Sequence, residues 1–118
     1  MMRNYTVAEI YARGGHDANG GVISQEARNE HMFIEGKALF SYGYHFPIAV
    51  RVGTNQYAFN SDKYSPTTSR HQTQSRAALM QRGAQLVMMP TELLQAIIGG
   101  ADWMKVYRLY STRKTVME

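Results

Sequence analysis

Apolar and polar residues alternate most regularly over residues 44–52, where every second side chain is apolar. A period of two predicts a β-strand with one buried face. Residues 37–42 predict a partner strand, and a turn at 53–55 leads into a further strand at 56–60, so we expect a three-stranded antiparallel meander. Pro47 cannot donate to a strand ladder, so its N–H position should face solvent or coincide with a β-bulge.

Helix-start and helix-stop residues predict three helices. Ser65 is a suitable N-cap, Pro66 a suitable first helical residue and Gly83 a suitable stop, so the residues between them should form one long helix. Shorter helices are expected over residues 6–12, capped by Thr6, and over residues 91–98.

The remaining segments are less regular. Residues 14–21 have the composition of a loop, and residues 25–29 could add a helical turn. A β-rich region should begin at 32–34, and residues 86–89 form a short apolar run. Residues 103–110 have helical spacing of their apolar side chains, but their aromatic and β-branched content favours a strand, which is our prediction.

These elements together predict an α+β fold, in which an antiparallel sheet contains the meander plus one or two further strands. Two or three helices should pack on one face of the sheet. A chain of 118 residues fits a single domain. We divide it into a variable N-terminal part (1–35), a meander and helix (36–83) and a C-terminal helix and strand (84–118).

Composition narrows the function classes. The absence of cysteine excludes disulfides and thiol nucleophiles, and no apolar run is long enough for a membrane span. No spacing of histidines and carboxylates suggests a metal site, and no glycine-rich phosphate loop is present, so we expect no metal and no cofactor. A cytoplasmic protein with no membrane partner is therefore expected, and a homo-oligomer stays open.

Charge is distributed unevenly along the chain. The net charge is +4, with five basic and five acidic residues over 1–59 but eight basic and four acidic residues over 60–118. A basic half favours an anionic partner, such as nucleic acid, although basic residues also serve solubility.

The best candidate site is the polar start of the long helix. No large apolar side chain occurs over residues 67–76, so we expect this half of the helix to be unburied, with its backbone donors and cations open to an anion. The same residues would also suit simple helix capping. The candidate binding residues are Tyr42, His45, Lys63, Tyr64, Ser65, Thr67, Thr68, Ser69, Arg70, His71, Gln74 and Arg76.

Two further features carry candidate chemistry. His45, on the polar face of the predicted strand, could pair with His71 and Arg70 for metal-independent cleavage of a phosphodiester. Residues 105–114 interleave cations with aromatic and apolar side chains, which suits single-stranded nucleic acid but suits a protected edge strand slightly better.

Three stretches of sequence resemble a motif of small uncharacterised proteins from bacteriophages and mobile elements. They read LFSYGYHFPIA at 39–49, FNSDKYS at 59–65 and TTSRHQ at 67–72. The resemblance implies a phage or mobile-element source and no particular reaction.

Three hypotheses follow for the function. The first is an accessory binding protein that engages nucleic acid, or a host protein that handles it, with a role against host defence. The second is a host-enzyme inhibitor that acts through protein contacts alone. The third is a small nuclease that uses His45 and His71.

Overall fold

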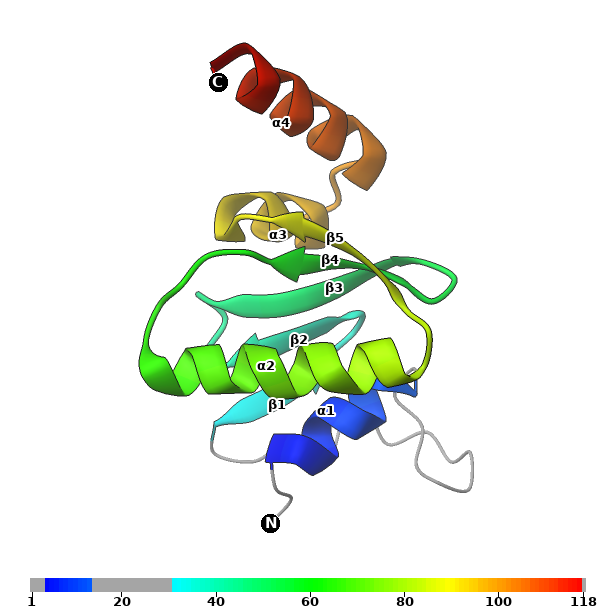
Figure 1. Cartoon of the computed structure of the whole chain (residues 1–118), viewed down its shortest axis with the longest axis vertical. Coiled ribbons are helices and arrows are strands. Elements are labelled where there is room, and N and C mark those ends of the chain that lie inside the picture. Colours follow the sequence, from blue (N-terminus) through cyan, green and yellow to red (C-terminus); the bar gives the residue numbers. More distant parts are fainter. Residues whose placement is uncertain (1–3, 14–30, 118) are drawn as a thin grey trace.

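The computed structural model describes residues 4–13 and 31–117; the loop expected at 14–21 and the helical turn expected at 25–29 lie outside them. Five strands form one sheet in chain order (Figure 1). The strands are β1 (Met32–Glu35), β2 (Ala38–Ser41), β3 (Pro47–Gly53), β4 (Gln56–Asn60) and β5 (Gln85–Met89). The helices are α1 (Asn4–Ala12), α2 (Pro66–Gln81), α3 (Thr91–Ile98) and α4 (Trp103–Met117).

The connections between strands follow from their directions. β1 to β4 are antiparallel neighbours joined by short turns, whereas β5 runs parallel to β4. Parallel neighbours need a long crossover, and α2 supplies it. The chain therefore adds a parallel strand to the meander by way of the helix that carries the candidate site.

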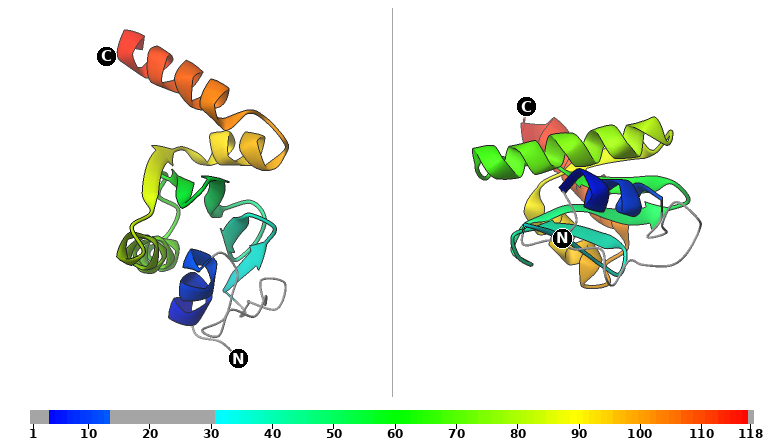
Figure 2. Two further views of the ribbon diagram at one scale, coloured as in Figure 1. Left: turned by 90° about the vertical axis from the view of Figure 1, so that its right-hand side faces the viewer. Right: turned by 90° about the horizontal axis from the view of Figure 1, so that it is seen from below.

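Helices cover both faces of the sheet. α1 and α2 lie together on one face, where they enclose a core that includes Leu39, Phe59 and Leu79 (Figure 2). α3 lies on the opposite face, where Leu94 packs against a second core around Phe40. The predicted α+β class is confirmed, with the difference that the helices are divided between the two faces.

The division of the helices has its cause in β3. Its first four residues are all buried, so both faces of this strand are apolar and both need a cover. The prediction of a strand over residues 44–52 was therefore wrong about its single buried face, and it was also wrong about the start of the strand. The strand begins only at Pro47, and Tyr44 and His45 lie in the turn before it.

A β-bulge accompanies Pro47, as expected. Leu39 pairs with Ala49 and Phe40 pairs with Pro47, so Ile48 is an extra residue on β3. Pro47 is also the first residue of the strand, which is a position where a missing N–H costs least.

The long helix is confirmed almost to the residue. Ser65 is its N-cap, and its side chain accepts a hydrogen bond from the Thr68 N–H at 3.1 Å. Gly83 adopts a φ of +71°, which a glycine takes up without strain, just after the helix ends. α3 has the predicted limits, whereas α1 begins at Asn4, so Thr6 is not its N-cap.

Residues 103–110 form the first half of a helix, and the predicted strand there was wrong. The carboxylate of Asp102 accepts hydrogen bonds from the N–H groups of Met104 at 3.0 Å and Lys105 at 3.3 Å, as an N-cap does. Trp103 and Tyr107, one turn apart, pack against the second core. Helical spacing was therefore the better guide than aromatic content. None of the helices within residues 4–13 and 31–117 has both the length and the apolar character of a bilayer span.

Candidate nucleic-acid interface

The polar half of α2 is divided into a buried side and an exposed side. Thr68, His71, Gln72 and Ser75 are buried, although none of them is apolar. The expectation that residues 67–76 would be unburied was therefore wrong for this side. Polar side chains can occupy a core when hydrogen bonds satisfy them, and each of these four forms at least one, although Gln72 Oε1 has no partner among the described residues.

His71 is held by a partner on β2. Its Nδ1 lies 2.8 Å from the hydroxyl oxygen of Ser41, which is itself 3.4 Å from the hydroxyl of Thr68. Its ring centroid lies 5.5 Å from that of Tyr42 and 6.3 Å from that of His31. Burial, aided by the neighbouring His31 and Arg70, lowers the pKa of His71 below its ordinary value. The imidazole is therefore neutral at neutral pH, and it cannot serve as a cation for an outside anion.

Gln72 ties the helix to the end of β4. Its Nε2 donates to the carbonyl oxygens of Asn60 at 3.0 Å and Asp62 at 2.9 Å. The side-chain amide of Asn60 in turn donates to the Pro47 carbonyl at 2.7 Å and to the Thr91 hydroxyl at 2.9 Å. These bonds join β3, β4, α2 and the start of α3, and no periodic pattern in the sequence predicts them.

The helix start has its backbone donors largely occupied. Pro66 has no N–H, the Thr68 N–H is bonded to the Ser65 side chain, and the Ser69 N–H is bonded to the Ser65 carbonyl at 2.9 Å. The start of α2 is therefore a capped helix end, which is the simpler of the two readings that the sequence allowed.

The exposed side of α2 keeps its cations. Lys63, Arg70, Arg76 and Arg82 are exposed, and no aspartate or glutamate occurs in residues 63–91. In the described parts of the chain none of these four cations forms an ion pair, whereas Arg13 and Glu9 do so at 3.6 Å. Arg70 and Arg76 lie on α2, Lys63 lies before it and Arg82 is its C-cap residue, so the helix and its two ends present four cations without internal neutralisation.

A small hollow of about 120 Å³ lies between α2 and β5. Lys63 and Arg76 contribute cations to its lining, and Ser69 and Thr73 contribute hydroxyls. This combination of groups suits a phosphate oxygen.

The twelve candidate residues do not form one site. Thr68 and His71 are buried, while Ser65, Thr67, Ser69 and Gln74 are partly buried. The exposed members are Tyr42, His45, Lys63, Tyr64, Arg70 and Arg76. The basic members thus remain available on the surface, while the helix-start members serve the core and the cap.

The two histidines of the nuclease hypothesis have different aromatic neighbours among the described residues. The ring of His45 lies in an exposed turn, 5.6 Å from the ring of Tyr64. The ring neighbours of His71 are His31 and Tyr42. The described residues also hold no group of three histidine or acidic side chains that could bind a metal ion.

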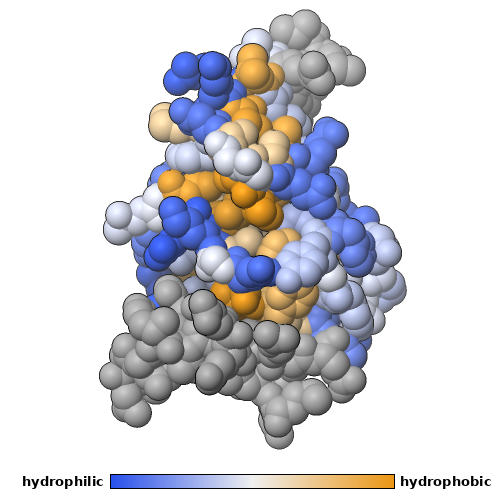
Figure 3. Space-filling view, turned by 180° about the vertical axis from the view of Figure 1, so that it is seen from behind, coloured by the Kyte–Doolittle hydropathy of each residue, from blue (hydrophilic) through white to orange (hydrophobic). Residues whose placement is uncertain are grey.

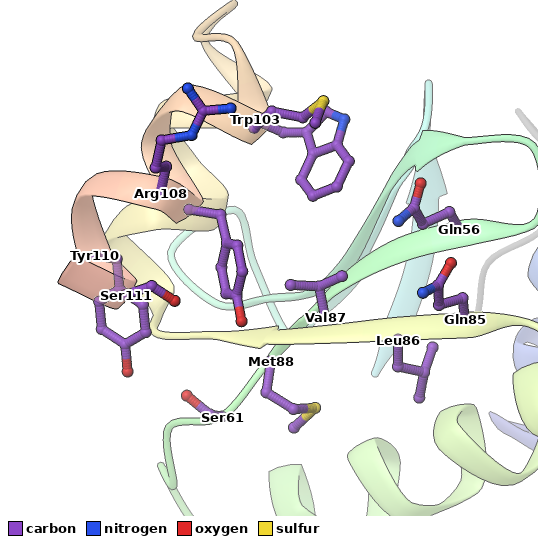
Figure 4. A pocket seen from close by; sticks show the side chains of 12 residues that line it. Gln56, Ser61, Gln85, Leu86, Val87, Met88, Trp103, Arg108, Tyr110 and Ser111 are labelled. Carbon is purple, nitrogen blue, oxygen red and sulfur yellow. The ribbon is translucent and has the colours of Figure 1, made fainter. Parts of the chain in front are cut away.

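A larger hollow, which the sequence did not point to, lies between β5 and α4 (Figure 4). Its volume is about 970 Å³, and it is lined by Trp103, Tyr107 and Arg108 from α4 and by Val87 and Met88 from β5. Figure 3 shows apolar side chains gathered in a band that runs from α4 towards the sheet, with hydrophilic side chains beside it. The helical spacing of Trp103, Tyr107 and Tyr110 could have indicated that these side chains line one wall of the hollow, but the prediction of a strand there placed them differently.

The comparisons with known proteins identify a family. A family model matches residues 5–84, which is more than half of the chain. The chain belongs to DUF8033, a family of unknown function. The DUF8033 match runs from α1 past the end of α2, so it includes the contact between Ser41 and His71 and most of the N-terminal part that we expected to be variable. No curated protein and no solved structure matches the chain.

Proposed function

We propose that this protein is an accessory binding protein that engages nucleic acid through the exposed basic side of α2. One observation carries the proposal: Lys63, Arg70, Arg76 and Arg82 lie exposed in a stretch of 29 residues, 63–91, that contains no carboxylate. Unpaired cations on a rigid helix can neutralise phosphates and release their counterions. The hydroxyl of Ser69, which lines the same hollow as Arg76, adds an uncharged donor for a phosphate oxygen, whereas the Thr73 hydroxyl donates to the Ser69 carbonyl at 3.0 Å.

The setting of this function is part of the same proposal. The resemblance of residues 39–49, 59–65 and 67–72 to a motif of small phage and mobile-element proteins supports such a source, a cytoplasmic location in an infected host, and a role against host defence that is based on nucleic acid.

The test is the salt dependence of binding. We expect a fluorescein-labelled oligonucleotide of about 20 nucleotides to bind with an affinity that falls steeply between about 50 and 200 mM salt. The double variant Arg70→Ala/Arg76→Ala should bind more weakly and should reduce the slope of log K against log salt by about 1.4 for a single strand. Fluorescence anisotropy measures both quantities.

A matched control removes the same charge elsewhere. Lys37 and Arg51 are also exposed, and they lie outside residues 63–91, at the β1–β2 turn and on β3. The variant Lys37→Ala/Arg51→Ala should keep the slope of the unmodified protein. Binding that is absent, that is independent of salt, or that weakens equally in both double variants would reject the proposal.

A further inference from the structure

β5 is the last strand of the sheet, and its outer side has no partner strand among the described residues. Two backbone hydrogen bonds fix how β5 faces β4. The Gln85 N–H donates to the Asn55 carbonyl at 2.9 Å, and the Ser61 N–H donates to the Met89 carbonyl at 2.8 Å. Gln85 and Met89 therefore direct their backbone groups towards β4.

The orientation of backbone groups alternates along a strand. Val87, two residues from both ends, must therefore also direct its N–H and C=O towards β4. Leu86 and Met88 direct theirs away from the sheet. The free edge of β5 thus offers two donors and two acceptors in the spacing that a further strand requires.

This edge lacks the usual protection against strand addition. Exposed edge strands are commonly blocked by charged residues, by proline or by a bulge. The residues of β5 are Gln-Leu-Val-Met-Met, with no charge and no proline, and their pairing with β4 is regular throughout. Met88 is 41% exposed at this edge.

The two sides of the edge differ in chemistry. On the side of α4, the large hollow presents the aromatic side chains of Trp103, Tyr107 and Tyr110 (Figure 4). On the side of α2, the small hollow presents Lys63 and Arg76. Met88 and Ser61 line both hollows, so the two adjoin at this edge, and neither is lined by a carboxylate.

We propose that the free edge of β5 binds an extended acidic peptide of a partner protein, which adds to the sheet as a further strand. Successive side chains of such a peptide point to opposite faces. One set would lie against Trp103 and Tyr107 and should be apolar, and the other would face Lys63 and Arg76 and should be acidic. The chemistry of both walls therefore specifies alternation of apolar and acidic residues.

Charge also argues against a second copy of this chain as the occupant. A second copy would bring its own Lys63, Arg76 and Arg108 to the same edge, in a chain whose net charge is +4. Like charges placed together at an interface oppose association. The cations at this edge attract an acidic partner, whereas they repel the same cations of a second copy.

The test uses blocked peptides with the full chain. The probe is acetyl-Glu-Val-Glu-Val-Glu-Val-Glu-amide, and the charge-reversed control replaces every glutamate by lysine. We expect the acidic peptide to slow the amide hydrogen exchange of Leu86 and Met88 by about tenfold or more and to leave Val87 unchanged, because only the first two amides face the added strand. NMR-detected exchange reads each amide separately.

A third peptide isolates the main-chain contribution. It is the acidic probe with N-methyl groups on two consecutive central residues, so that a donor facing β5 is lost in either register. Its affinity should fall by about tenfold, which corresponds to about 1.4 kcal/mol, because the lost donor leaves an acceptor of β5 unpaired. Equal affinity of the methylated and unmethylated peptides, or equal protection by the lysine peptide, overturns the proposal.

Variants of Met88 test the same edge from the side of the protein. Met88→Pro removes an outward N–H that makes no bond to β4, so it should abolish peptide binding, whereas Met88→Ala keeps the N–H and should retain it. If Met88→Pro does not fold, the methylated peptide supplies the decisive comparison. The comparison of methylated and unmethylated peptides and the oligonucleotide titration are separate measurements on the unmodified protein, so this proposal and the proposed function can fail independently.

Two other results would also overturn the proposal. One is protection of the Leu86 and Met88 amides without any peptide, in a chain that sediments as a dimer. The other is protection of these amides by an oligonucleotide and not by the acidic peptide.

Discussion

The two parts of the chain, residues 5–84 and residues 85–118, satisfy their polar and apolar groups in different ways. The first part belongs to DUF8033 and buries polar side chains in pairs, such as Ser41 with His71. The second part ends the sheet with β5, whose outer edge has no partner strand among the described residues, and continues into α4, which reaches away from the sheet at one end of the molecule (Figure 1). The buried polar groups of the first part bond within the fold and only its surface cations stay available, whereas the second part also leaves the outer backbone groups of β5 available to a partner.

The largest expected effect tests this contrast with two leucines. Leu79 is fully buried on α2, and Leu109 is 68% exposed on α4. Leu79→Ala should lower the free energy of unfolding by about 2–5 kcal/mol because it removes core contacts and leaves a cavity. Leu109→Ala should change it by less than about 0.5 kcal/mol. Urea denaturation measures both, and similar losses would contradict the contrast.

The next effect concerns the buried polar pair. Ser41→Ala removes the hydroxyl that lies 2.8 Å from His71 Nδ1, and it should lower the free energy of unfolding by about 1–3 kcal/mol. The control is Ser61→Ala, at an exposed serine, which should have little effect in the same denaturation experiment. A neutral result for Ser41→Ala would mean that the polar core contributes no stability.

A smaller effect separates two glycines that follow helices. Gly83, after α2, has a φ of +71°, whereas Gly99, after α3, has a φ of −76°. Gly83→Ala should lower the melting temperature, at a cost of about 1 kcal/mol, because an alanine is strained at positive φ. Gly99→Ala should be neutral or slightly stabilising. Calorimetry measures both melting temperatures, and a larger decrease for Gly99→Ala than for Gly83→Ala would contradict this prediction.

The smallest effect is a pH dependence from one histidine. The pKa of His71 is lower in the folded protein than in the unfolded chain, where it is about 6.5. The unfolded state then binds more protons, so the contribution to stability is fully present above about pH 6.5 and is lost as pH falls from there towards the folded pKa. His71→Gln should weaken the dependence of the melting temperature on pH between pH 7 and pH 5. An unchanged pH dependence would mean that other groups cause it.

Several elements could be predicted from the sequence because their signals are local. Ser65, Pro66 and Gly83 act on adjacent backbone, so the predicted limits of α2 agree with the observed limits to within about one residue. The turn at residues 53–55 and the bulge beside Pro47 also depend on short-range geometry. In contrast, the Asp102 cap of α4 was overlooked in favour of aromatic content.

The candidate site was predicted less well, for a physical reason. Whether Thr68, His71 and Gln72 face solvent depends on partners as distant as Ser41 and Asn60, and helical periodicity treats them simply as polar. Only the exposure of the cations on α2 agreed with the expectation.

The sequence by itself determined the α+β class, the helix limits set by capping residues, and the absence of carboxylates between residues 63 and 91. Tertiary structure decided which polar side chains became core, which face each helix covered, and that β5 took the edge of the sheet beside α4. Caps and turns act over a few residues, whereas burial and strand order depend on contacts between segments far apart in the chain, which no short window of sequence contains.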